Sequence, residues 1–395
     1  MTLGRTYLDH NATSPLRPEA REAMMAALDV AGNASSVHAE GRRARALVEA
    51  AREQVAATAG AKPREIVFTS GGTEANNAVF KGAWDQLLVS SVEHDSVLAS
   101  AKHTDAPLVV MPVRRDGVLD VAFVAAFLKR ETSGFKRALL SVQVANNETG
   151  VVQPMAKLMA LAREHGVAVH IDAVQAAGKV PLDFSQLGVD FMTLSAHKIG
   201  GPKGVGALVI RDGITLAPLL RGGGQELRQR AGTENVAGIA GFGKAAEMAL
   251  AALPDMNSTR QLRDRLEREA MRIAPGAIVV AQAADRLPNT TCLALPGANA
   301  ETLVIALDLA GIAVSAGAAC SSGKVGRSPV LTAMGLTGGA HGEPDLSGSA
   351  IRISLGWNTK AGDIDAFLAA WAQIAPRQGA QAAQRLSIET RRAVA

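Results

Sequence analysis

The sequence is poor in several features that mark particular classes of protein. It has two cysteines, Cys292 and Cys320, in 395 residues, which excludes a disulfide framework and a cysteine-rich metal site, so no metal is expected within the chain. Its 41 Lys and Arg residues are dispersed, which argues against nucleic acid as the main partner. No apolar run approaches the roughly 18 residues that cross a bilayer, and residues 1–11 lack the apolar core of a signal peptide. We therefore expect a soluble, cytoplasmic enzyme.

What the chain does contain is an ordinary globular composition, with 48% hydrophobic and 20% charged residues. Between residues 60 and 210, short apolar segments alternate with helical patterns. This alternation is typical of a doubly wound α/β domain with a mostly parallel sheet. The expected strands are 66–69, 87–91, 108–112, 138–144, 167–171, 191–194 and 207–210.

The pattern changes beyond Pro254, where two shorter strands, a helix and glycine-rich segments indicate an α+β arrangement. A chain of 395 residues is also long for one typical core. We predict a large domain over residues 15–253 and a smaller α+β domain formed by residues 1–14 and 254–395.

Polar loops follow five of the expected strands, at residues 70–73, 93–94, 146–148, 172–175 and 195–198. In doubly wound folds, ligands bind at the carboxyl ends of the strands. We therefore expect these loops to meet at one edge of the sheet and to form the binding site.

The loop that contains Lys198 is rich in glycine. A lysine held in such a turn suits an amine that must reach a fixed point, as in a Schiff base; a surface hairpin with an ordinary lysine explains the same pattern. Asp172 follows an earlier strand, and a buried carboxylate there needs a partner, such as a protonated pyridine nitrogen. Pyridoxal phosphate chemistry needs this arrangement, in which a carboxylate (Asp172) is followed by a crossover, a strand and a lysine (Lys198).

The loop Ser70-Gly71-Gly72-Thr73-Glu74 lies between a strand and a helix. Its glycines leave backbone N–H groups open to an anion at the start of the helix. Capping of the helix by Thr73 explains the loop as well. No Gly-Lys-Ser/Thr sequence follows, so it is not a P-loop.

The sequence resembles the cysteine desulfurases, a group within the class V aminotransferases. The resemblance covers nearly the whole chain and rests on ordered motifs that include YLDHNAT (7–13), FTSGGTEANN (68–77), VEHDSVL (92–98), NNETG (146–150), HIDAVQAAGKVPLD (170–183), LSAHKIGGPKGVG (194–206), RAGTENV (230–236), SAGAACSSG (315–323) and IRISLG (351–356). It implies a fold of the aspartate-aminotransferase type, known as fold type I, with pyridoxal 5'-phosphate as the cofactor.

The resemblance also assigns roles to residues of the cofactor site. Lys198 carries the cofactor, Asp172 pairs its ring nitrogen, and Gln175 donates to the ring hydroxyl. The phosphate is expected to be held by Gly72, Thr73, Ser195 and His197, with Thr233 reaching it from the partner subunit of a homodimer. His94 is expected to stack on the ring and to move protons. The bare sequence does not separate this role from that of a strand-end histidine satisfied by the backbone, which without the resemblance is the favoured interpretation.

Three residues are assigned to the substrate by resemblance: Asn147, Arg352 and Asn33. Asn147 is also counted with the cofactor site. Arg352 alternates with Ile351 and Ile353 in a short strand, which points it away from the apolar face. A guanidinium suits a bidentate contact with a carboxylate. The competing interpretation is an edge-strand arginine in water.

Cys320 lies among small residues, in AGAACSSG, and is interpreted as a mobile nucleophile, whereas Cys292 fits an inert strand residue. The resemblance then implies conversion of L-cysteine to L-alanine, with sulfur left on Cys320 as a persulfide. The segment 311–331 is long, which in the family accompanies delivery of sulfur to an iron–sulfur scaffold or another acceptor. Cys320 could transiently ligate an iron–sulfur cluster together with such a partner.

Three other functions stay open at this point. A selenocysteine lyase shares the cofactor and the carboxylate clamp. Another class V aminotransferase has no use for Cys320, and a non-catalytic sulfur carrier would have lost Lys198 or Asp172, both of which are present.

Overall fold

The fold is described from a computed structural model that covers residues 5–131, 137–317, 326–338 and 343–394. Its main element is a seven-stranded sheet with the strand order β2-β8-β7-β6-β5-β3-β4. The strands are β2 (Ile66–Thr69), β3 (Gln86–Ser90), β4 (Leu108–Met111), β5 (Ala138–Gln143), β6 (Ala168–Asp172), β7 (Phe191–Ser195) and β8 (Gly206–Ile210). The pairs β2–β8 and β7–β8 are antiparallel and the other four pairs are parallel, which confirms the predicted mostly parallel sheet.

Helices cover both faces of this sheet. They are α1 (Pro18–Leu28), α2 (Ala39–Ala59), α3 (Gly72–Phe80), α4 (Asp95–Lys102), α5 (Val121–Glu131), α6 (Met155–Glu164), α7 (Phe184–Leu187) and α8 (Val236–Ala251). Alternate residues of the strands face opposite ways: Ile66 and Phe68 pack in a core with α2 and α8, whereas Val67 packs in a core with α3 and α4. Because both faces are buried, the strands are continuous apolar runs.

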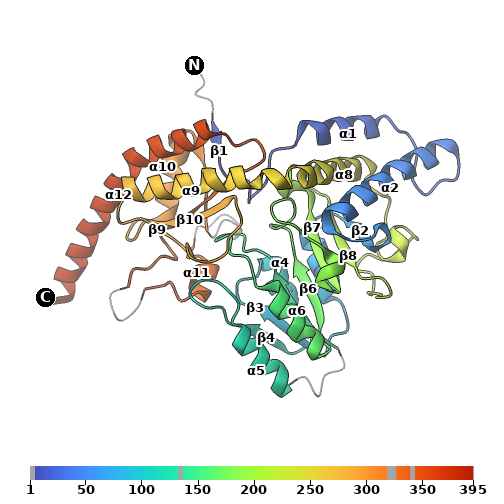
Figure 1. Ribbon diagram of the computed structural model, residues 1–395, viewed down its shortest axis with the longest axis horizontal. Coiled ribbons are helices and arrows are strands. Elements are labelled where there is room, and N and C mark those ends of the chain that lie inside the picture. Colours follow the sequence, from blue (N-terminus) through green and yellow to red (C-terminus); the bar gives the residue numbers. More distant parts are fainter. Residues whose placement is uncertain (1–4, 132–136, 318–325, 339–342, 395) are drawn as a thin grey trace.

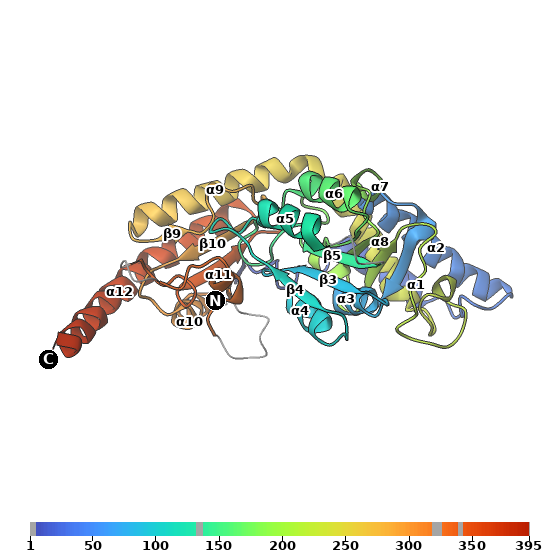
Figure 2. The ribbon, with the colours of Figure 1, turned by 90° about the horizontal axis from the view of Figure 1, so that it is seen from below.

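A second, antiparallel sheet lies beyond α8, with the order β12-β13-β10-β9. Its strands are β9 (Ile278–Val279), β10 (Thr290–Ala294), β12 (Ser315–Ala316) and β13 (Ala350–Ser354), and its helices are α9 (Met256–Ile273), α10 (Ala300–Leu309), α11 (Pro329–Ala333) and α12 (Ala361–Val394). The helices α9 and α12 pack on one another, and α12 continues away from the body of the molecule (Figures 1 and 2). The proposed domain boundary at residue 253 falls in the short turn Leu253–Asp255 between α8 and α9 and stays a prediction.

The N-terminal segment connects the two sheets. Strand β1 (Thr6–Tyr7) pairs with β11 (Ile312–Ala313), and Leu8 packs in the hydrophobic core of the second sheet. A few residues later, the Ser14 N–H donates to the carbonyl oxygen of His197, in the turn that follows β7. This segment therefore lies against the loop that the sequence singled out.

Within the described part of the chain, no single helix is long and apolar enough to cross a membrane. The helix α8 and the following segment Leu253–Ile273 meet the length and composition requirement only when taken together, and they are bent by 49°.

Candidate active site

A cavity of about 220 Å³ lies at the carboxyl ends of the central strands. Ten of the residues predicted for the site line it: Gly72, Thr73, His94, Asn147, Asp172, Gln175, Ser195, His197, Lys198 and Arg352. It is also lined by Asn11, Asn76, Ser96, Gln143, Ala145 and Val174, which the sequence did not single out.

Lys198 is positioned by a short 3₁₀ turn, Ala196–Lys198, that follows directly on β7. Its Nζ donates to the carbonyl oxygens of Asn11, at 2.6 Å, and Ala12, at 2.8 Å. Gly200 after the turn has φ +85°, and a Cβ there would lie 2.6 Å from the Arg17 side chain. Glycine is therefore required where the chain turns back, and the lysine lines a cavity rather than an open hairpin.

Asp172 ends β6 and is 7% exposed. Its Oδ1 accepts from the Val174 N–H and its Oδ2 from the Asn76 side chain, both at 3.0 Å. No cation within the described ranges forms an ion pair with it. A buried carboxylate satisfied only by neutral donors still favours a positively charged partner.

The start of α3 forms another wall of the cavity. The residue before the helix, Gly71, offers no side chain to the N–H groups of the first turn, so the alternative of capping by Thr73 is wrong. Ser195 and His197 line the cavity with Gly72 and Thr73. Burial and the charges of neighbouring lysines, Lys198 first, lower the pKa of His197 to about 4, so its ring is neutral at pH 7. These groups form a donor-rich site for an anion.

His94 precedes α4 and caps it. Its Nδ1 accepts from the Ser96 N–H at 3.1 Å and lies 2.8 Å from the Ser96 hydroxyl. The same ring lines the cavity. His94 therefore both caps α4 and lines the cavity.

Arg352 lies in β13, which is flanked by β12 and β10 and is not an edge strand. Its side chain is 2% exposed, so the alternative of an arginine in water is wrong. Its Nη2 pairs with Asp9 Oδ1 at 2.8 Å and its Nη1 donates to the Asn147 carbonyl at 3.0 Å. Its Nε is buried without a partner among the described residues, as expected where a ligand is to be bound.

Two predicted residues within the described part of the chain, Asn33 and Thr233, do not line this cavity. Asn33 is exposed, and its side chain accepts from the Ser35 N–H. Thr233 is also exposed. Cys320 lies outside the described residues. Cys292, in contrast, is fully buried in β10, and burial raises the pKa of its thiol far above the ordinary value, which fits the predicted inert residue.

The family model "Aminotransferase class-V" matches residues 6–367 of this chain. The chain belongs to the class-V aminotransferase family. It is 45% identical to a cysteine desulfurase of Cereibacter sphaeroides over 377 residues, which are 92% of this chain and 94% of that protein. It is 39% identical to "Cysteine desulfurase IscS" of Dictyoglomus turgidum, over 91% of each chain.

Solved structures agree with these relatives. The NifS-like protein of Rickettsia africae matches with a TM-score of 0.85 and 34% identity, over 94% of this chain and 99% of that one. A structure described as SspA in complex with cysteine matches with a TM-score of 0.75 and 30% identity, over 89% and 98% of the two chains. Together these matches confirm the fold and the membership in the cysteine desulfurase group predicted from the motifs.

Members of this family use pyridoxal phosphate, and the residues of the cavity fit it. Asp172 is a buried carboxylate without a cationic partner in the described part of the chain, and a protonated ring nitrogen would supply one. The N–H groups at the start of α3, with the Ser195 hydroxyl, suit a phosphate. A Cβ on Gly72 would lie 3.0 Å from the Val174 side chain, so glycine allows the helix to begin this close to the end of β6.

The most connected residue that the sequence did not single out is Asn11. Its carbonyl accepts from Lys198, and its side chain donates to Thr290 at 2.9 Å and accepts from Asn289 at 3.1 Å. The motif YLDHNAT contains it, but a turn of polar residues gives no indication of partners so distant in the sequence.

Proposed function

We propose that the protein is a pyridoxal-phosphate-dependent cysteine desulfurase that converts L-cysteine to L-alanine and leaves the sulfur as a persulfide on Cys320. The observation that carries this proposal is the joining of Lys198, Asp172 and Arg352 in one cavity, although they come from two different sheets. The relatives named cysteine desulfurase support the reaction.

Pyridoxal phosphate, when bound, supplies a ring that accepts the electrons released at the substrate α-carbon. Asp172 would keep the ring nitrogen protonated. The Lys198 amine would anchor the cofactor and afterwards move the proton at the α-carbon, and its contacts with the Asn11 and Ala12 carbonyls fix it in the cavity. His94 would provide a second site for protons beside it.

Arg352 would bind the carboxylate of the substrate. Asp9 and the Asn147 carbonyl hold its guanidinium in place, so little side-chain entropy is lost when an anion binds. The unpartnered Nε gives it a donor for that anion. The similar SspA structure is a complex with cysteine, which supports an amino acid with a carboxylate as the substrate here.

The thiolate of Cys320 would attack the sulfur of the bound cysteine. An S–S bond forms as the bond between Cβ and sulfur breaks, and the electrons of that bond stay with the carbon, which gains a proton to give alanine. The described residues on the two sides of Cys320 support this role: Gly317 and Ser328 both lie against Glu148, whose neighbour Asn147 lines the cavity.

Two further parts of the proposal concern partners. Thr233 is exposed and lies outside its own cavity, which supports a homodimer in which it reaches the phosphate of the other subunit. The persulfide sulfur would pass to an acceptor protein, and we propose an iron–sulfur scaffold protein as this acceptor. We propose that the protein acts in the cytoplasm.

The test is incubation of the purified holoenzyme with L-cysteine, with alanine and protein-bound persulfide measured together. We expect equal amounts of both in the first turnover, no covalent cofactor in Lys198→Ala, and bound cofactor without persulfide in Cys320→Ala. Pyruvate in place of alanine, or full desulfuration by Cys320→Ala without added thiol, would contradict the proposal. Faster turnover of selenocysteine with no persulfide would favour a selenocysteine lyase instead.

A further inference from the structure

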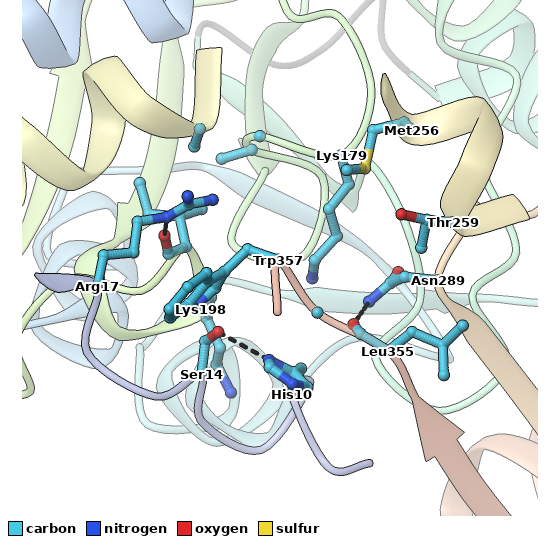
Figure 3. Close-up of a pocket in the computed structure, with 15 residues that line it drawn as sticks. His10, Ser14, Arg17, Lys179, Lys198, Met256, Thr259, Asn289, Leu355 and Trp357 are labelled. Carbon is cyan, nitrogen blue, oxygen red and sulfur yellow. Dashed lines mark hydrogen bonds between the residues drawn. The ribbon is translucent and has the colours of Figure 1, made fainter. Parts of the chain in front are cut away.

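A second lysine, Lys179, lies close to the cofactor cavity, in the turn after β6. It is 9% exposed and, among the described residues, no carboxylate pairs with it. It lines a separate cavity of about 40 Å³ together with Lys198, His10 and Arg17, and no Asp or Glu of the described ranges lines that cavity (Figure 3). Lys198 lines both cavities, so Lys179 lies beside the cofactor cavity, on the smaller cavity that shares Lys198 with it.

An unpaired buried lysine is costly to the folded state, which calls for a reason to keep it. Burial is the main cause that lowers the pKa of Lys179, to about 7, and the charges of Lys198 and Arg352 lower it further. The charge of Lys179 in turn lowers the pKa values of His10 and His197, and Arg17 lines the same cavity. Perturbed groups of this kind concentrate at functional sites.

The bonds of Lys179 lead into the cofactor cavity. Its Nζ donates to Gln175 Oε1 at 2.9 Å and approaches Asn11 Oδ1 at 3.4 Å. Gln175 Nε2 donates to the Asn11 carbonyl at 2.9 Å, and that carbonyl also accepts from Lys198. Lys179 and Lys198 are thus connected through two residues, Gln175 and Asn11.

This arrangement decides which end of the Gln175 amide faces which neighbour. The amine of Lys179 can donate whether or not it is protonated, and the Asn11 backbone carbonyl can only accept. The Gln175 oxygen must therefore face Lys179, and its NH₂ group must face Asn11. One N–H of that group is used by Asn11, and the second remains for the cavity that Gln175 lines.

We propose that Lys179 is a positioning residue that holds the Gln175 amide with its N–H directed at the cofactor. The inference rests on the proposed use of pyridoxal phosphate, with Gln175 as the donor to the ring oxygen. Without Lys179, the amide loses the hydrogen-bond donor on its oxygen side and can rotate. Removal of such an outer hydrogen-bond partner typically weakens binding by about 10- to 100-fold in metal sites, and we expect about tenfold here.

The test is the equilibrium binding of pyridoxal phosphate to the apoprotein, without any turnover. We expect Lys179→Met to raise the dissociation constant about tenfold and to change the absorbance maximum of the bound cofactor. Lys157→Met, at an exposed position on α6, is the matched control and should bind like the wild type. Gln175→Ala should bind weakly, and adding Lys179→Met to it should cause no further loss, because Lys179 acts through Gln175.

Equal binding of pyridoxal phosphate by Lys179→Met and the wild type would overturn the inference. It would also be overturned if Lys179→Met weakened binding as much in the Gln175→Ala variant as it does in the wild type. If Lys179→Met does not fold, Lys179→Ala replaces it in both the single and the double variant, with the same expected result. Wild-type apoprotein that binds no pyridoxal phosphate would instead refute the proposed function. The two failures are therefore distinguishable.

Discussion

The hydroxyl of Ser328 donates a hydrogen bond to the carboxylate of Glu148, with 2.5 Å between Oγ and Oε2. The same Oε2 faces Gly317, where a Cβ would lie only 2.6 Å away. Gly317 and Ser328 are described residues on opposite sides of Cys320. The buried Glu148 carboxylate therefore lies against residues on both sides of Cys320 in the sequence, the proposed site of the persulfide.

This contact predicts that Gly317→Ala slows sulfur transfer more than it affects the cofactor. The new methyl group has to displace the Glu148 carboxylate, and such overpacking costs about 1–3 kcal/mol of stability. We expect a slower release of alanine from L-cysteine with an unchanged cofactor spectrum. The matched control is Gly326→Ala, because nothing in the described ranges lies within 4 Å of a Cβ at that position. Equal loss in the two variants would contradict the prediction.

Glu148 itself should make the stability of the protein depend on pH. Burial raises the pKa of its carboxyl from 4.5 to about 7, against the opposing effects of Ser328 and Arg352. The folded state therefore binds the proton more tightly than the unfolded state, and stability falls as the pH rises from about 4.5 to about 7.

In Glu148→Gln this loss is absent, because the amide does not ionise and its oxygen still accepts from Ser328. The difference in unfolding free energy between variant and wild type should grow by about 1.4 kcal/mol for each pH unit in that window. Urea unfolding at a series of pH values measures it, with the exposed Glu53→Gln as the control. If the difference in unfolding free energy between Glu148→Gln and the wild type does not vary with pH, the raised pKa of Glu148 is contradicted.

Lys179 predicts a pH dependence of the opposite sign. Its pKa is lowered from 10.5 to about 7 in the folded state, so the unfolded state binds the proton more tightly between these values. Stability is therefore lost as the pH falls from about 10.5 to about 7. Lys179→Met should gain about 1.4 kcal/mol relative to the wild type for each unit of that fall. Unfolding of the apoprotein at pH 7, 8.5 and 10 tests this, and a gain that grows with rising pH would refute it.

The features that the sequence predicted correctly are those that depend on residues close together in the chain. Apolar runs bounded by polar loops located the central strands, and the rule that ligands bind at strand ends brought Asp172 and Lys198 to one edge. The structure ends β6 at Asp172 and β7 at Ser195, next to the 3₁₀ turn that carries the lysine. Such features depend on a few neighbouring residues, so a pattern contains them.

The remaining features depend on segments far apart in the chain. Arg352 fits an edge strand until β10 and β12 are placed on either side of β13, and only then is it buried. Lys179 looks like an exposed loop residue in AAGKV. Its burial requires the N-terminal turn and residues near Leu355 to pack over it. No local periodicity reports such contacts.

The proposed homodimer predicts complementation between an inactive subunit and a weakly active one. Thr233 is exposed in a loop and does not line the cavity of its own chain. If it binds the phosphate of the other subunit, Thr233→Ala loses a hydrogen bond to a charged group, about 1.5–3 kcal/mol, and is weakly active at limiting cofactor. A mixed dimer of Lys198→Ala and Thr233→Ala subunits then contains one site with both residues intact. We expect it to form alanine at about half the wild-type rate, measured on dimers purified through two different tags. If Thr233 served its own subunit, the mixed dimer would contain no intact site and would be no more active than Thr233→Ala alone.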